Sequence, residues 1–112
     1  MTIGDEEKIV VIADPDLEDL IPGFLENRRQ DLARLAAALQ RGEYETIRNL
    51  GHAMKGFGKS YGFAEITEIG SRIERAALEK AAVRIAQAVD ELAGYLGRVH
   101  VVYHGDETTD QA

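Results

Sequence analysis

The sequence contains no cysteine among its 112 residues. This absence excludes a disulfide framework and a thiolate metal site, and it fits a reducing cytoplasm. Long hydrophobic runs are also missing, because no stretch approaches the roughly 20 apolar residues that a membrane-spanning helix needs. The N-terminus begins with Thr, Ile, Gly and three acids after Met1, and it lacks the basic and apolar regions of a signal peptide. We therefore expect a soluble, unprocessed, cytoplasmic protein.

Basic residues are outnumbered by acidic ones. The chain has 13 Lys and Arg against 20 Asp and Glu, for a formal net charge of −7. Binding to nucleic acid or to an anionic membrane requires a basic patch that neutralises phosphates. Neither is therefore expected as a partner. The length of 112 residues fits one domain with one core.

Apolar residues recur along most of the chain at the three- and four-residue spacings of amphipathic helices. This pattern predicts an all-α fold, an antiparallel up-down four-helix bundle preceded by a short N-terminal helix. We expect an extended segment at residues 1–13, the bundle at 14–104 and a disordered acidic tail at 105–112. No apolar stripe is left over once the core is filled, so a monomer is expected.

Capping and turn residues predict where the helices begin and end. Asp14 as N-cap and Pro15 in the first turn start the short helix, and Pro22 is expected to end it or to kink it into the next. The second helix is predicted to stop at Arg41–Gly42, and Gly62 to close the third. The last two helices carry the apolar stripes Ile66, Ile69, Ile73 and Ala76, and Ile85, Val89, Leu92, Leu96, Val99 and Tyr103.

The helix predicted from about Tyr44 to Tyr61 has two contrasting faces. Its apolar stripe, expected to face the core, consists of Ile47, Leu50, Met54, Phe57 and Tyr61. The opposite face carries Arg48, His52, Lys55, Gly56 and Lys59. The histidine is therefore expected to point to solvent beside cationic side chains, which suits a reactive group better than a core residue.

Glycine inside an exposed helix costs about 1 kcal/mol relative to alanine. This helix nevertheless carries Gly56 one turn after His52, and Gly58 two residues later. We interpret these glycines as clearing space for a phosphoryl group or an approaching partner. Lys55 and Lys59 on the same face can supply the cations that an added dianion needs.

These residues resemble the histidine-containing phosphotransfer (HPt) domain of bacterial two-component phosphorelays. The matching motif is His-x-x-Lys-Gly followed by a glycine ten residues after the histidine, here His52, Lys55, Gly56 and Gly62. One departure is Lys59, which stands where a small residue is common. Downstream, an apolar ladder ends in an isoleucine–glutamate pair, formed by Phe63, Ile66, Ile69, Ile73 and Glu74.

The resemblance implies a phosphocarrier rather than an enzyme, with His52 holding a phosphoryl group on Nε2. The implied partners are a response-regulator receiver domain or a hybrid histidine kinase, and the receiver would supply the magnesium ion and most of the catalytic apparatus. Lys55 and Lys59 would offset the arriving charge and Gly56 would leave room for it. The residues expected to meet or admit the partner are Arg48, Gly58 and Gly62.

Other interpretations of the sequence remain open. The bundle could be a scaffold that binds receiver or kinase domains without phosphotransfer, or the amino-terminal domain of a larger sensor kinase. His100 and His104, one turn apart on the predicted last helix, are a weak metal pair, and we expect neither a metal nor a cofactor. We interpret one group of charged residues as a solvated, salt-bridged face, namely Glu68, Arg72, Glu74, Arg75 and Glu79.

Overall fold

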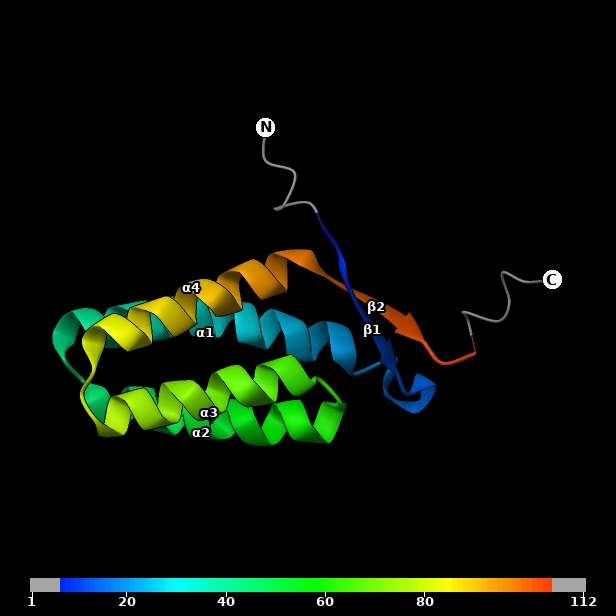
Figure 1. Ribbon diagram of the computed structural model, residues 1–112. Coiled ribbons are helices and arrows are strands. Elements are labelled where there is room, and N and C mark those ends of the chain that lie inside the picture. Colours follow the sequence, from blue (N-terminus) through cyan, green and yellow to red (C-terminus); the bar gives the residue numbers. More distant parts are fainter. Residues whose placement is uncertain (1–6, 106–112) are drawn as a thin grey trace.

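The computed structural model of the chain describes residues 7–105. Residues 7–105 form four long helices and two short strands. Figure 1 shows the helices side by side, with the strands at one end of the bundle. No described helix is long and apolar enough to span a membrane. In chain order the elements are strand β1 (Ile9–Ala13), the 3-10 helix η2 (Pro15–Leu17), helices α1 (Ile21–Arg41), α2 (Tyr44–Tyr61), α3 (Ala64–Leu78) and α4 (Ala82–Arg98), and strand β2 (Val99–Tyr103).

Consecutive helices run in opposite directions, so the predicted all-α, up-down four-helix bundle is confirmed (Figure 1). Glycines make the first two reversals tight. Gly42 and Gly62 adopt φ values of 70° and 82°, a left-handed conformation that costs glycine little. Their N–H groups donate to carbonyls of the preceding turn, which satisfies the C-terminal ends of α1 and α2.

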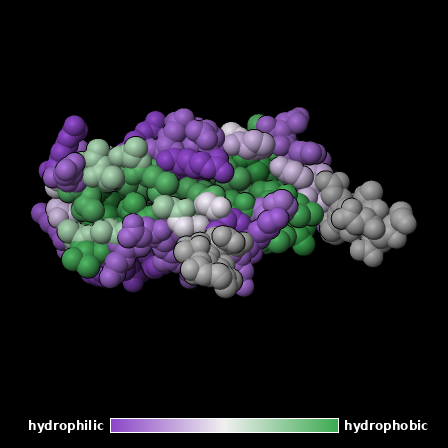
Figure 2. Space-filling view, turned by 90° about the horizontal axis from the view of Figure 1, so that it is seen from above, coloured by the Kyte–Doolittle hydropathy of each residue, from purple (hydrophilic) through white to green (hydrophobic). Residues whose placement is uncertain are grey.

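The core lies between the four helices. Burying one large apolar side chain there stabilises the fold by about 1.5–3 kcal/mol relative to leaving it exposed. Seen from the side of α1 and α4, hydrophobic surface remains visible along the middle of the molecule between hydrophilic borders (Figure 2). The largest fully buried side chains are Phe63, Ile21, Leu35, Ile47, Met54, Ile66, Ile69, Ile73, Ile85 and Leu92.

Glycines bring α2 and α3 into close contact. A Cβ atom on Gly70 would lie 2.7 Å from the backbone nitrogen of Lys55 and 2.8 Å from the carbonyl oxygen of Gly51. A Cβ on Gly58 would lie 2.6 Å from the nitrogen of Thr67. Since real Cβ atoms do not approach backbone atoms so closely, these positions require glycine at the observed separation of the helices.

The beginning of the bundle differs from the prediction at Pro22. Asp14 does act as an N-cap, because its Oδ1 accepts from the backbone N–H of Asp16 at 2.9 Å, but the helix that follows is only the three-residue η2. Pro22 does not end a helix. It occupies the first turn of α1, where a missing N–H leaves no hydrogen bond unmade.

The prediction that the last helix extends to Tyr103 is wrong. Helix α4 ends at Arg98, and the chain continues as β2, which pairs in parallel with β1 in a register that runs from Ile9 opposite Val99 to Ala13 opposite Tyr103. The cause is the valine-rich sequence of Val99–Tyr103, because β-branched residues favour a strand and can pair with the apolar strand β1. His100 therefore lies on a strand, and His104 follows it.

The predicted core-facing stripe of α2 is also partly wrong. The buried residues of α2 are Ile47, Gly51, Met54 and Gly58, whereas Phe57 is 46% exposed. The close approach of α3 turns the glycine side of α2 inward and leaves Phe57 at its edge. There the guanidinium carbon of Arg28 lies 5.1 Å from the centre of the Phe57 ring and 5.0 Å from that of Phe24.

Residues 9–13 are extended, as strand β1. The rest of the expected N-terminal segment, residues 1–6, and the tail at 106–112, for which disorder is expected, lie outside the described residues.

Candidate functional site

His52 projects from the middle of α2 into solvent. Its side chain is 69% exposed, while its neighbour Gly51 is buried against α3. The helix therefore presents the imidazole on its outer face, as the periodicity predicts. The ring is nevertheless held, because its Nδ1 lies 3.0 Å from Oε2 of Glu74 on α3.

The partner at Nδ1 determines which nitrogen is free to react. An ionised carboxylate can only accept hydrogen bonds, so Nδ1 must carry the proton that it shares with Glu74. In the neutral imidazole the other nitrogen, Nε2, then has no proton and presents its lone pair. The geometry thus leaves an unprotonated nitrogen on a side chain that is largely exposed.

Glu74 also binds Lys55, one turn further along α2. The Lys55 Nζ lies 3.0 Å from Glu74 Oε1, so the two carboxylate oxygens hold one residue each. The hydrogen bond from Lys55, with a smaller contribution from His52, lowers the pKa of the Glu74 carboxyl below its ordinary value although burial opposes the shift. Glu74 is therefore ionised near neutral pH and fixes an imidazole and an ammonium group on the same face.

The glycine contacts between α2 and α3 explain how Glu74 reaches both residues. Gly70 lies one turn before Glu74, and Gly51 immediately precedes His52. A Cβ on Gly51 would lie only 2.7 Å from the backbone nitrogen of Glu74. With the backbones this close, a glutamate side chain spans the remaining distance to α2.

The role of Glu74 is not predicted from the sequence pattern, which groups it with a salt-bridged arginine face. That interpretation is wrong for Glu74, because its partners lie on α2. Two other members of that face also have partners outside it, since Arg72 Nη1 lies 2.8 Å from Glu91 Oε1 and Glu79 pairs with Arg84. His52 and Glu74 are 22 residues apart in sequence, and only the register of α2 on α3 shows that they meet.

The remaining predicted site residues lie along the same helix, except Gly62, which caps its C-terminal end. A Cβ on Gly56 would have no neighbour within 4 Å among the described residues, so the space beside His52 is open. Lys59 is exposed. Nη2 of Arg48 lies 3.8 Å from Oε2 of Glu45.

An open depression at the end of α2 is lined by Gly58, Lys59, Gly62, Ala64 and Thr67. Gly58 is expected on an exposed surface, but it is buried, and its contact with α3 gives it a structural role.

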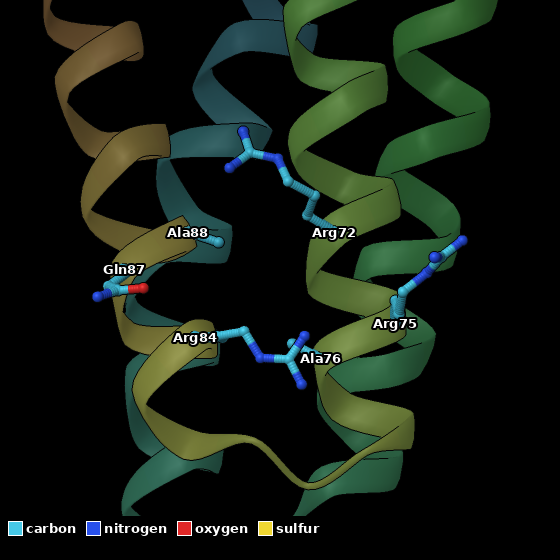
Figure 3. A pocket seen from close by; sticks show the side chains of 6 residues that line it. All are labelled: Arg72, Arg75, Ala76, Arg84, Gln87 and Ala88. Carbon is cyan, nitrogen blue, oxygen red and sulfur yellow. The ribbon is translucent and has the colours of Figure 1, made fainter.

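A separate pocket of about 170 Å³ lies between α3 and α4, and Figure 3 shows the side chains of Arg72 and Arg84 extending into the space between these helices, whereas that of Arg75 points away from α4. It shares no residue with the cluster of His52, Lys55 and Glu74. Arg72 and Arg84, which border it, are already paired with glutamates. Its lining consists of Arg72, Arg75, Ala76, Arg84, Gln87 and Ala88.

Within residues 7–105 there is no group of three or more His, Cys, Asp or Glu side chains that could hold a metal ion. His100 and His104 are not one turn apart on a helix, as the weak metal interpretation required.

The fold and the site together define a four-helix bundle with a solvent-facing histidine that is anchored by a carboxylate and flanked by lysines. The model of the family described as Hpt domain matches residues 19–100, so the chain belongs to the Hpt domain family. Members of this family are phosphocarriers, and the membership assigns the chain to histidine phosphotransfer with receiver and kinase domains of two-component systems. Comparison with curated proteins and with solved structures gave no match.

Proposed function

We propose that this chain carries a phosphoryl group on Nε2 of His52, received from the phosphoaspartate of a receiver domain or from a histidine kinase and passed on to another receiver. The observation that supports this proposal best is the hydrogen bond between His52 Nδ1 and Glu74, which leaves Nε2 exposed and nucleophilic. Family membership gives the class of reaction, and the geometry favours Nε2 as the reacting atom.

The transfer requires no proton to leave His52. The Nε2 lone pair attacks the phosphorus of the aspartyl phosphate, the P–N bond forms, and the P–O bond breaks with its electron pair on the aspartate carboxylate. The Nδ1 proton stays on the ring, and the positive charge that develops there faces the Glu74 carboxylate at 3.0 Å. The reverse sequence returns the phosphoryl group to a second aspartate. The magnesium ion belongs to the receiver.

Residues near His52 neutralise the charge of the phosphoryl group, leave space for it and contact the partner. Lys55 and Lys59 offset the charge of the phosphoryl oxygens, and the open space at Gly56 admits the group. The partner is proposed to contact the surface that runs from Arg48 to the depression lined by Gly58 and Gly62.

The test is to incubate the protein with a panel of phosphorylated receiver domains and to measure its intact mass at neutral, acidic and alkaline pH. We expect one phosphoryl adduct that is lost in acid and stable in alkali. Tryptic digestion should place it on the peptide from Asn49 to Lys55, which contains His52 as its single histidine, whereas His100 and His104 belong to the C-terminal peptide. A folded protein that binds receivers but gains no adduct would support the scaffold alternative instead.

Replacing Glu74 by Gln is expected to slow phosphotransfer about tenfold, the order of a hydrogen bond to a charged group. The amide has nearly the same shape, but one of its two ends is an NH2 donor, so only one of Nδ1–H and Lys55 keeps an acceptor, and that acceptor is uncharged. Because the pKa of Glu74 is lowered in the folded state, its stabilising interaction is present above its ordinary pKa and is lost as the pH falls through the lowered value. The Gln variant should therefore lose less stability on acidification than the wild type. Quenched time courses measure the rate of phosphotransfer. Urea denaturation at several pH values measures the pH dependence of stability. A variant with wild-type transfer would show that Glu74 does not position His52.

Replacing Gly56 by Phe is expected to reduce the transfer rate more than tenfold while the melting temperature stays near that of the wild type. The ring has room on the surface of α2 but would occupy the space beside His52. The matched control is Gly56→Ala, whose methyl group is small and whose helix propensity is higher. A Phe variant that melts much earlier yet still transfers would show that Gly56 serves the fold.

A further inference from the structure

Strand β1, at the end of the bundle, has an outer edge and a row of side chains that the rest of the described chain leaves uncovered. Val10 and Ile12 of β1 are 58% and 59% exposed, although both are large and apolar. The strands form a sheet of only two, in the order β1-β2 (Figure 1). Isolated two-stranded sheets have marginal stability in water. The unpaired edge of an apolar strand is a site where a further strand can add.

Backbone directions show which groups of β1 are free. The N–H of His104 donates to the carbonyl of Ala13 at 2.8 Å, so the backbone groups of Ala13 face β2. Backbone groups alternate along a strand, and those of Val11 and Ile9 therefore face β2 as well. The N–H and C=O groups of Val10 and Ile12 point to the opposite side, where no described strand pairs with them.

In place of the monomer expected from the apolar stripes of the helices, we infer that β1 is the interface for a second copy of this chain, through antiparallel pairing of β1 with β1 about a two-fold axis at Val11. In this register Val10 of one copy faces Ile12 of the other, and both have outward backbone groups that can exchange hydrogen bonds. The result is a continuous four-stranded sheet in the order β2-β1-β1-β2. The exposed apolar side chains of the two copies then pack against each other across the strands.

Charge complementarity selects this register. It places Lys8, just before β1, opposite Asp14, just after β1, at both ends of the paired strands. Both residues are exposed, and neither has an ion-pair partner among residues 7–105. Self-pairing of β2 about Val101 would instead bring Arg98 opposite His104, with no opposite charges to match. The β1 edge is therefore the self-complementary one.

The test is sedimentation equilibrium of the full chain from low micromolar to millimolar concentration. The wild type should approach twice the mass of one chain. Lys8→Glu should raise the dimer dissociation constant about tenfold, because two symmetric attractions become repulsions. The double variant Lys8→Glu with Asp14→Lys should restore dimerisation. The control Lys80→Glu, which makes the same change of charge at the opposite end of the bundle, should leave the dissociation constant unchanged.

A second variant tests the hydrogen bonds directly. Ile12→Pro removes an outward N–H that makes no bond to β2, so it should abolish dimerisation while the far-ultraviolet spectrum stays helical. A wild type that remains monomeric at every concentration would overturn the inference. So would a dimer that survives Ile12→Pro or does not respond to the charge reversal at Lys8. Another protein that adds to the same edge would leave the wild type monomeric alone, which also contradicts self-pairing. None of these outcomes depends on phosphotransfer by His52.

Discussion

His52→Gln is expected to abolish phosphoryl transfer completely. Glutamine has no ring nitrogen that could form the P–N bond, so the loss exceeds what any neighbouring substitution produces. The fold should be unaffected, because the side chain is 69% exposed and the amide can still donate to Glu74. Intact mass after incubation with phosphorylated receivers, together with the melting temperature, measures both effects.

Two control measurements make the His52→Gln result specific. His100→Gln changes the same residue type on an exposed position of β2 and should leave the adduct intact. Receiver binding should also survive in the His52 variant, because the surface from Arg48 to Gly62 is otherwise unchanged. If the His52→Gln protein still gained an acid-labile phosphoryl group, another residue would be the acceptor and the proposed mechanism would fail.

Gly70→Ala is expected to lower the free energy of unfolding by about 3 kcal/mol, at the upper end of what overpacking costs. The added methyl group would lie 2.7 Å from the backbone nitrogen of Lys55 and 2.8 Å from the carbonyl oxygen of Gly51. Backbone atoms cannot rotate away as a side chain can, so α3 must move from α2. This cost outweighs the roughly 1 kcal/mol that alanine gains in helix propensity. Urea denaturation measures the change.

The matched control for Gly70→Ala is Gly56→Ala on the neighbouring helix. A methyl group on Gly56 would meet no neighbour within 4 Å among the described residues, so there the same substitution should raise the free energy of unfolding by about 1 kcal/mol. The two variants differ only in what the methyl group meets. If both stabilised the protein, the close contact of α2 and α3 would not be a requirement of the fold.

The helical framework could be predicted from the sequence because it depends on local patterns. Apolar spacing predicts the helices, and Gly42 and Gly62 predict the ends of α1 and α2. The exposure of His52 follows from the same spacing. Each of these features depends on residues within a few turns of one another.

Features that depend on how the helices meet could not be predicted in the same way. Glu74 reaches His52 only because glycines let the backbones of α2 and α3 pack closely. From the sequence alone, a glycine can indicate either close packing of two helices or a flexible backbone. The error at Phe57 has the same origin. The strand β2 could not be predicted because β-branched residues at helical spacing fit either structure, and the choice depends on β1, about 90 residues earlier in the chain.

The anchoring of His52 and Lys55 by one carboxylate has a consequence for encounters with a partner. Their orientation is established when the chain folds, so docking need not freeze two mobile side chains. In a flexible site, side-chain conformational entropy is lost each time a partner binds. Here the entropy of these two side chains is lost when the chain folds. A surface prepared in this way can react during a short contact and release its partner quickly, since productive geometry does not rely on tight binding.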